Sequence, residues 1–211
     1  MKHNNIIKLS AITAMTALSL LSCEEHQALP DTSKGVGNII LANNAIVAPE
    51  SYDREAGNAV GVIYHVSGDT AYVVCVRECG TLSFSNDDQA IDGISKSTYD
   101  YKGFENTVAI LAEKDITSDA VSEIENLPNA WYLPSAGELR TLSSNLPVVE
   151  RSLRIVGGEP FYDEYYLSST EDGSTQSSSE MFVYCVNVRN GYLATTRKSE
   201  PKRVRPFMRF K

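Results

Sequence analysis

The stretch Trp131-Tyr132-Leu133-Pro134-Ser135-Ala136-Gly137-Glu138-Leu139 holds a complete helix-start signature. Ser135 followed three residues later by Glu138 is a capping box. The serine side chain accepts a hydrogen bond from a free amide of the first turn, and the glutamate returns to the amide of the serine. Apolar residues follow at helical spacing, at Leu139, Leu142 and Leu146. The pattern predicts a helix that begins at Ser135 and buries its leucine face.

Three other segments have a helical period. Residues 106–114 place apolar side chains on one face, and residues 118–126 do so after a serine that favours a helix N-cap. Residues 148–156 form a further helical stretch, which should stop at Gly157-Gly158. We therefore expect two to four short helices, the last of them separate from the helix that begins at Ser135.

The first third of the domain is strand-like. Residues 38–41 are apolar, and residues 61–66 and 70–76 are rich in β-branched and aromatic side chains. Ser67-Gly68-Asp69 joins the latter two, so they are predicted to pair as a hairpin. Residues 82–84 are expected to form another short strand before a polar loop.

The last third is also strand-like. Residues 165–167 predict a short strand, and residues 168–180 a serine-rich loop. Residues 181–189 and 192–196 flank Asn190-Gly191, a pair that favours a two-residue hairpin turn in which both positions take a positive φ.

The chain closes with residues 203–210, where Pro206 favours an edge strand or a strand end. Strands, then helices, then strands predict one α+β domain with antiparallel hairpins. The sequence shows no internal repeat and no second domain.

The N-terminus has the organisation of a lipoprotein signal peptide. Lys2 and Lys8 precede an uncharged run over residues 9–21, which is too short to span a bilayer, and the run ends at Ser22-Cys23. We expect cleavage before Cys23 and a lipid such as palmitate on that cysteine. Residues 1–22 are then the signal peptide, residues 23–35 a flexible tether, and residues 36–211 the folded domain.

Charge and cysteine content limit the partners and the location. Residues 1–22 hold two of the 19 basic residues and none of the 27 acidic ones, so the mature chain carries a net charge of −10. Such a chain should not bind nucleic acid through bulk charge. We expect an outer-membrane lipoprotein that faces either the periplasm or the cell surface, and Glu24-Glu25 resembles a surface-export signal.

Three cysteines follow Cys23, at positions 75, 79 and 185. One disulfide with one free thiol and three free thiols are both open. If residues 75–79 were extended they would span about 13 Å, and a disulfide needs Cα atoms within about 7 Å.

Three motifs occur in order along the domain. Residues 131–139 match W-x-L-P-[ST]-x-x-E-L, residues 165–171 are similar to Y-W-S-S-T-E with Leu167 near the usual tryptophan, and residues 202–207 are similar to a closing V-R-P-V. Residues 103–109 are similar to a D-G-x-x-N-T stretch. Together they resemble the Lcl C-terminal-type domain of bacterial surface proteins, over roughly residues 36–211.

The resemblance implies a C-type-lectin-like fold and a role for each motif. Trp131 would pack the capped helix, Ser168-Ser169-Thr170 would leave the core strand and start a variable loop, and Arg205 would hold the closing strand. Related hypervariable receptors carry their variable residues on the hairpin between the last two motifs, which corresponds to residues 168–203 here.

Catalytic and metal-binding chemistry is not indicated. Calcium-dependent sugar binders of this fold class use Glu-Pro-Asn or Gln-Pro-Asp loops, whereas here Phe161 follows Glu159-Pro160 and Lys202 follows Glu200-Pro201. A catalytic pair would have to use His65, which lies in a predicted strand. We expect no enzyme activity, no metal site and no cofactor.

Recognition by the surface of the C-terminal hairpin is the leading hypothesis. Tyrosine, asparagine and arginine combine rigid contact area with adaptable hydrogen bonding. The expected ligand is a glycan or a protein, bound in adhesion or reception. The alternatives are an accessory or anchor subunit of a surface fibre or complex, and, third, an enzyme. The candidate ligand-binding residues are Tyr184, Asn187, Arg189, Asn190, Tyr192 and Arg197.

Overall fold

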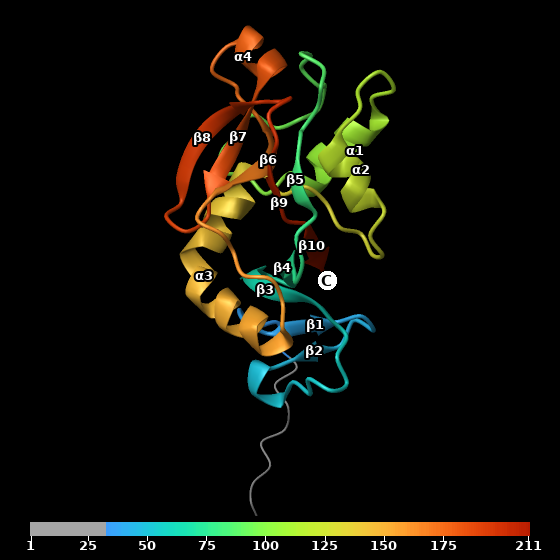
Figure 1. Ribbon diagram of the computed structural model, residues 1–211, viewed down its shortest axis with the longest axis vertical. Helices are drawn as coiled ribbons and strands as arrows, with labels where there is room; N and C mark the ends of the chain where they lie inside the picture. The colour runs from blue at the N-terminus through green and yellow to red at the C-terminus, as the bar shows by residue number, and fades with distance from the viewer. Residues whose placement is uncertain (1–32) are drawn as a thin grey trace, which may run out of the picture.

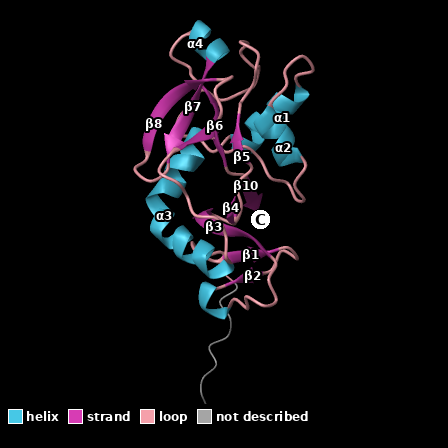
Figure 2. Cartoon of the chain, viewed as in Figure 1, coloured by secondary structure: helices cyan, strands magenta, loops and turns pink. Residues whose placement is uncertain are grey.

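The computed structural model describes residues 33–211, which form an α+β domain built on two five-stranded sheets (Figures 1 and 2). The predicted signal peptide and most of the predicted tether lie outside the described residues.

The first sheet has the order β10-β4-β3-β1-β2, and all its neighbouring strands are antiparallel. The predicted hairpin is confirmed, because Ser67 pairs with Thr70 across a turn in which Gly68 has a φ of +54°. The sheet contains β1 (Ile39–Leu41), β2 (Ile46–Val47), β3 (Ala59–Ser67), β4 (Thr70–Cys75) and β10 (Phe207–Phe210).

The second sheet has the order β5-β9-β6-β7-β8. One of its pairs is parallel, where Tyr166 lies opposite Arg203, and the others are antiparallel. Pro206 ends β9 and separates it from β10, as expected for a proline at a strand end. The strands are β5 (Gly80–Leu82), β6 (Tyr165–Glu171), β7 (Phe182–Asn187), β8 (Tyr192–Arg197) and β9 (Lys202–Val204).

Four α-helices and one 3₁₀ turn complete the domain. The N-cap predicted at Ser118 is confirmed, since its side chain accepts a hydrogen bond from the Val121 amide. The helices are α1 (Gly103–Ala112), α2 (Asp119–Glu125), α3 (Ala136–Val156) and α4 (Gln176–Met181), and the 3₁₀ turn covers Pro49–Ser51.

Helix α3 corrects the prediction of two short helices after Ser135. It runs without a break for 21 residues, with Pro147 inside it, and ends as predicted at Gly157, whose φ is +70°. An internal proline costs about 3 kcal/mol because it removes a hydrogen bond and crowds the preceding turn. The apolar face is buried on both sides of the proline, at Leu142, Leu146, Val149 and Leu153, and this burial offsets that cost.

The loops of the C-terminal third also differ from expectation. Ser168-Ser169-Thr170 lies fully buried inside β6 and does not start a loop, because its hydroxyls bond to neighbouring backbone: Ser168 Oγ donates to the Tyr184 carbonyl at 2.7 Å. The turn between β7 and β8 has four residues, and only Gly191 takes a positive φ there, of 73°. The Asn187 carbonyl stabilises this longer turn by accepting from the amides of Asn190 and Gly191.

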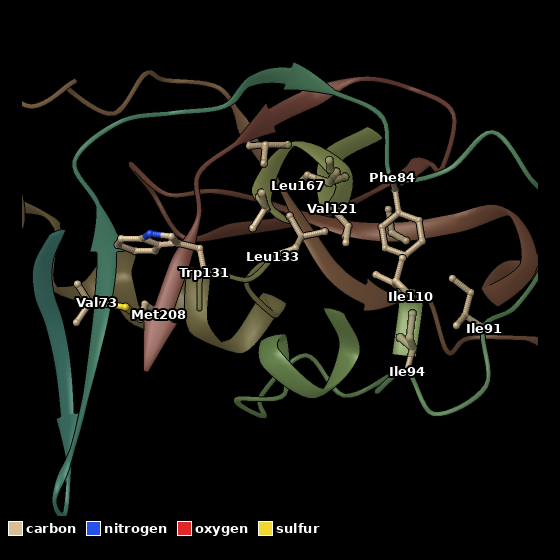
Figure 3. Close-up of a cluster of buried hydrophobic side chains, with 14 of the residues drawn as sticks. Val73, Phe84, Ile91, Ile94, Ile110, Val121, Trp131, Leu133, Leu167 and Met208 are labelled. Carbon is tan, nitrogen blue, oxygen red and sulfur yellow. The ribbon is translucent and has the colours of Figure 1, made fainter. Parts of the chain in front are cut away.

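The core has two clusters of apolar side chains. One contains side chains of both sheets and of α1 and α2, and there Trp131 packs beside Val73 and Met208 (Figure 3). The other lies under α3 and contains Tyr132. The tyrosine, and not Trp131 as the resemblance implied, therefore packs the capped helix.

The capping box at the start of α3 is confirmed, and its glutamate does more than cap. The Glu138 side chain is fully buried. Its Oε2 accepts from the amides of Ser135 at 2.7 Å and Gly103 at 3.2 Å, and its Oε1 accepts from the Tyr132 hydroxyl at 2.6 Å. A Cβ at Gly103 would come within 2.3 Å of Oε2, so only glycine lets α1 start here. One carboxylate thus joins the first turns of α1 and α3 to residue 132.

Glu138 should make the stability of the domain depend on pH. Burial raises its pKa, and the donated hydrogen bonds oppose this only in part. The folded protein therefore holds the proton more tightly than the unfolded chain. The stabilising contribution is complete below about pH 4.3, the unfolded value, and is lost as the pH rises through the raised folded value. Glu138→Gln keeps a polar side chain of the same size but cannot ionise, so it should remove the part of the pH dependence that Glu138 causes.

The measurement is urea unfolding of the wild type and the glutamine variant between pH 4 and pH 8. Glu138→Ala is the comparison, because it leaves two buried amides without an acceptor and should cost about 3 kcal/mol throughout. Parallel stability profiles for the wild type and Glu138→Gln would contradict the expectation.

Candidate ligand-binding site

Two of the six candidate residues on the C-terminal hairpin are held by polar contacts within the domain. The Tyr184 hydroxyl donates to Asp172 Oδ1 at 3.0 Å. The Asn187 side chain is buried and donates to Asp163 Oδ1 at 2.8 Å. Both side chains therefore stabilise the sheet and have limited freedom to meet a ligand.

The two arginines of the set are engaged as well. Arg189 forms an ion pair with Glu150 of α3 at 2.7 Å and donates to the Phe161 carbonyl. Arg197 is exposed, and its guanidinium lies over the ring of Phe182, 5.5 Å from the centroid.

Most basic side chains of residues 168–203 are paired with acidic ones in the fold. Lys198 is fully buried and forms an ion pair with Glu171 at 2.6 Å. Arg203 bridges Glu78 and Glu164, and Lys202 pairs with Glu200. These contacts leave little uncompensated positive charge on this part of the surface.

The other two candidates, Asn190 and Tyr192, are exposed at the turn between β7 and β8. Asn190 borders a hollow of about 400 Å³ between this turn, the first half of α3 and the loop before α1. We call it the polar hollow. Its lining includes Tyr99, Arg140, Thr141, Ser143, Ser144 and Asn190.

Arg140 and Tyr99 line the polar hollow and contact each other. The Arg140 guanidinium lies 4.8 Å from the centroid of the Tyr99 ring, and its Nη1 donates to the Thr98 carbonyl at 3.4 Å. Tyr99 is 76% exposed, so its ring is accessible to a ligand. A stacked cation and ring, with hydroxyl and amide groups around them, can bind a ligand that has both an apolar face and hydrogen-bonding groups.

Two close approaches fix the walls of the polar hollow. A Cβ at Gly137 would lie 2.3 Å from the Asp100 carbonyl oxygen, and the Ser135 hydroxyl donates to that same oxygen at 2.7 Å. On the other side, a Cβ at Gly191 would lie 3.3 Å from Ser143 Oγ. The loop before α1 and the hairpin turn therefore both rest directly on α3.

The sequence indicated Asn190 but did not single out Tyr99 or Arg140. They are 41 residues apart, and no periodic pattern or motif relates them. Gly137 was the available signal, because a glycine in the first turn of a capped helix is costly unless another chain segment comes close.

Burial shifts the pKa of His65, the residue considered for a catalytic pair, and that of Cys185. His65 lies on β3 with its ring centroid 5.5 Å from that of Tyr72 and 5.4 Å from that of Tyr101, and burial lowers its pKa. Burial raises the pKa of Cys185 to about 11, so its thiol stays protonated at neutral pH.

The described residues hold no group of three or more histidine, cysteine, aspartate or glutamate side chains placed to bind a metal ion. Over the same residues, every helix is too short or too polar to cross a membrane.

Comparison of the sequence with protein-family models and with curated proteins gives no match. A functional assignment for this chain therefore has to rest on the geometry of the domain.

Proposed function

We propose that this chain is a lipid-anchored surface lipoprotein whose domain binds a glycan or a protein, and that the polar hollow contacts the ligand. The observation that carries the proposal is the exposed Tyr99 ring stacked with Arg140 and surrounded by hydroxyl and amide groups. A glycan suits this arrangement best, since a sugar offers a C–H face to an aromatic ring and hydroxyls to polar side chains.

The spatial arrangement of the three motifs supports a C-type-lectin-like fold as part of the proposal. The Ser169 amide donates to the Pro134 carbonyl at 2.8 Å, and the Ala136 amide donates to Thr170 Oγ1 at 3.0 Å, so the first two motifs are adjacent. Tyr132 of the first motif forms a bridge to Phe207 of the third.

The position of the polar hollow suits a tethered domain. Ser152, near the end of α3, donates to the Gly37 carbonyl at 2.6 Å, close to where the chain enters the domain. Arg140 lies twelve residues earlier on the same helix, which is about 18 Å along its axis. In Figure 1 the chain enters at the end of the domain that carries β1 and β2. A membrane at that end would leave the polar hollow accessible.

The proposal is tested by Arg140→Gln. The domain is screened on a glycan array, and the glycan it binds is titrated by calorimetry. Loss of a charge-assisted hydrogen bond and of the stacked cation should weaken binding by about 10- to 100-fold.

Arg151→Gln is the matched control. Arg151 is on the same helix, and its exposed ion pair with Glu50 lies outside the polar hollow. Equal affinities for the wild type and Arg140→Gln, or equal losses in the two variants, would argue against the polar hollow as the binding site.

Lipid anchoring has its own test. Cys23→Ala removes the residue expected to carry the lipid, so the protein should move from the membrane fraction to the soluble fraction and should no longer incorporate labelled palmitate. Cys185→Ala serves as control and should leave both readouts unchanged. Unaltered membrane association of Cys23→Ala would refute the anchor.

A second function, as a subunit of a surface fibre or complex, is favoured by the open edge of β8. The Lys198 amide donates to the Met181 carbonyl, so these two residues form a hydrogen-bonded pair at the end of the β7–β8 ladder. Counting back along β8 from Lys198, every second residue bonds to β7. The backbone groups of Leu193 and Thr195 therefore point away from β7. β8 is the last strand of its sheet in the described chain (Figure 1). An extended segment of a partner could pair there.

Thr195→Pro tests this second function because it removes one outward amide, whereas Thr195→Ala keeps it. If a partner strand adds to β8, crosslinking on intact cells should give a complex with the wild type and Thr195→Ala, and that complex should be lost with Thr195→Pro. A complex that forms equally with all three proteins would exclude pairing at this edge.

A further inference from the structure

Two of the cysteines lie beside each other in one pocket. Cys75 ends β4 and Cys79 precedes β5, and both line an apolar pocket of about 290 Å³ together with Trp131 and Leu127. Both thiols are free. Burial first, and then the nearby charge of Cys75, raises the pKa of Cys79 to about 12.

The backbone register brings the two residues close together. The Cys75 amide donates to the Pro206 carbonyl and the Cys79 amide to the Val204 carbonyl, both at 2.9 Å. These acceptors are two residues apart on the closing segment, which is about 6.6 Å of near-extended chain. Residues 75–79 thus leave the backbone pairing with the closing segment and return to it. They do not form the extended segment of about 13 Å that the sequence allowed.

The excursion formed by residues 75–79 surrounds the buried side chain of Arg205. Arg205 Nε donates to the Cys75 carbonyl at 2.8 Å, and its Nη2 donates to the Val76 carbonyl at 3.2 Å. Glu78 lies 3.5 Å from Nη1. Arg205 therefore holds the closing strand as expected, and the excursion supplies its acceptors.

We propose that Cys75 and Cys79 are a disulfide site, at which oxidation closes the excursion around the Arg205 guanidinium. The two residues that accept from their amides are about 6.6 Å apart along the closing segment, a spacing compatible with the 4.4–6.8 Å between Cα atoms that disulfides adopt. Both cysteines line the same pocket and pack against the same apolar core cluster. Cys185 has no part in it, since it is buried on β7 and donates to the Ala194 carbonyl.

The oxidant is a second disulfide, either of a dithiol oxidoreductase or of oxidised glutathione. One cysteine thiolate attacks it and forms a mixed disulfide, and the other thiolate then displaces the reduced oxidant. The two thiols lose two protons and two electrons in total, and the oxidant's disulfide becomes two thiols. Because both thiol pKa values are raised, the reaction should be faster at pH 9 than at pH 7.

Tryptic mapping of the detergent-extracted full chain tests the proposal. Cleavage after Arg77 places the two cysteines in different peptides, residues 55–77 and 78–96. After incubation with oxidised glutathione and alkylation of free thiols, we expect these peptides to be joined until a reductant separates them. Separate peptides after oxidation, or a crosslink to the peptide that contains Cys185, would overturn the proposal.

Matched variants complete the experiment, which does not depend on where the protein resides or on what it binds. Cys185→Ser should form the joined peptides, and Cys79→Ser should not. Oxidation should raise the thermal midpoint of the wild type and of Cys185→Ser by about 5 °C, reversibly. If the two peptides are joined but the thermal midpoint does not change, the result would contradict the closing of the excursion.

Discussion

The buried carboxylate of Glu138 is the contact on which the arrangement of the domain depends. It accepts hydrogen bonds from the Gly103 amide at the start of α1, and from the Ser135 amide and the Tyr132 hydroxyl in the segment that leads into α3. Removing such a group would leave several buried donors unsatisfied, so the two segments are fixed together. The first turn of α3 takes its position from this contact. Arg140, which lies in the next turn, is therefore placed by the core and not by the flexible surface.

Two further buried charges fix the parts of the chain that the carboxylate does not reach. The Lys198 ammonium bonds to Glu171 and to the Gln89 carbonyl, which ties the loop before α1 to the second sheet. The Arg205 guanidinium reaches carbonyls of the excursion and of Glu159. A buried ion pair adds little net stability because desolvation is costly, but losing one partner is strongly destabilising. These groups thus act mainly by specifying one arrangement of loops around the sheets.

Features that depend on neighbouring residues could be predicted from the sequence, and features that depend on distant ones could not. The caps at Ser135 and Gly157 and the first hairpin are local, and they are confirmed. The continuity of α3 through Pro147 depends on burial against both sheets, which no local pattern reveals. The polar hollow also depends on distant residues, because Tyr99 reaches Arg140 only through the close approach of the loop before α1 to Gly137.

The charge of the chain bears on which ligands the polar hollow can accept. With a net charge of −8, the protein repels acidic ligands at long range, although physiological salt screens this beyond about 8 Å. Arg140 forms no ion pair with the described carboxylates, in contrast to Arg189 and Arg203. Its guanidinium therefore remains able to donate to a ligand at short range. An uncharged sugar would meet no long-range repulsion and would still contact the Tyr99 ring, so the proposed function predicts neutral glycans in preference to acidic ones.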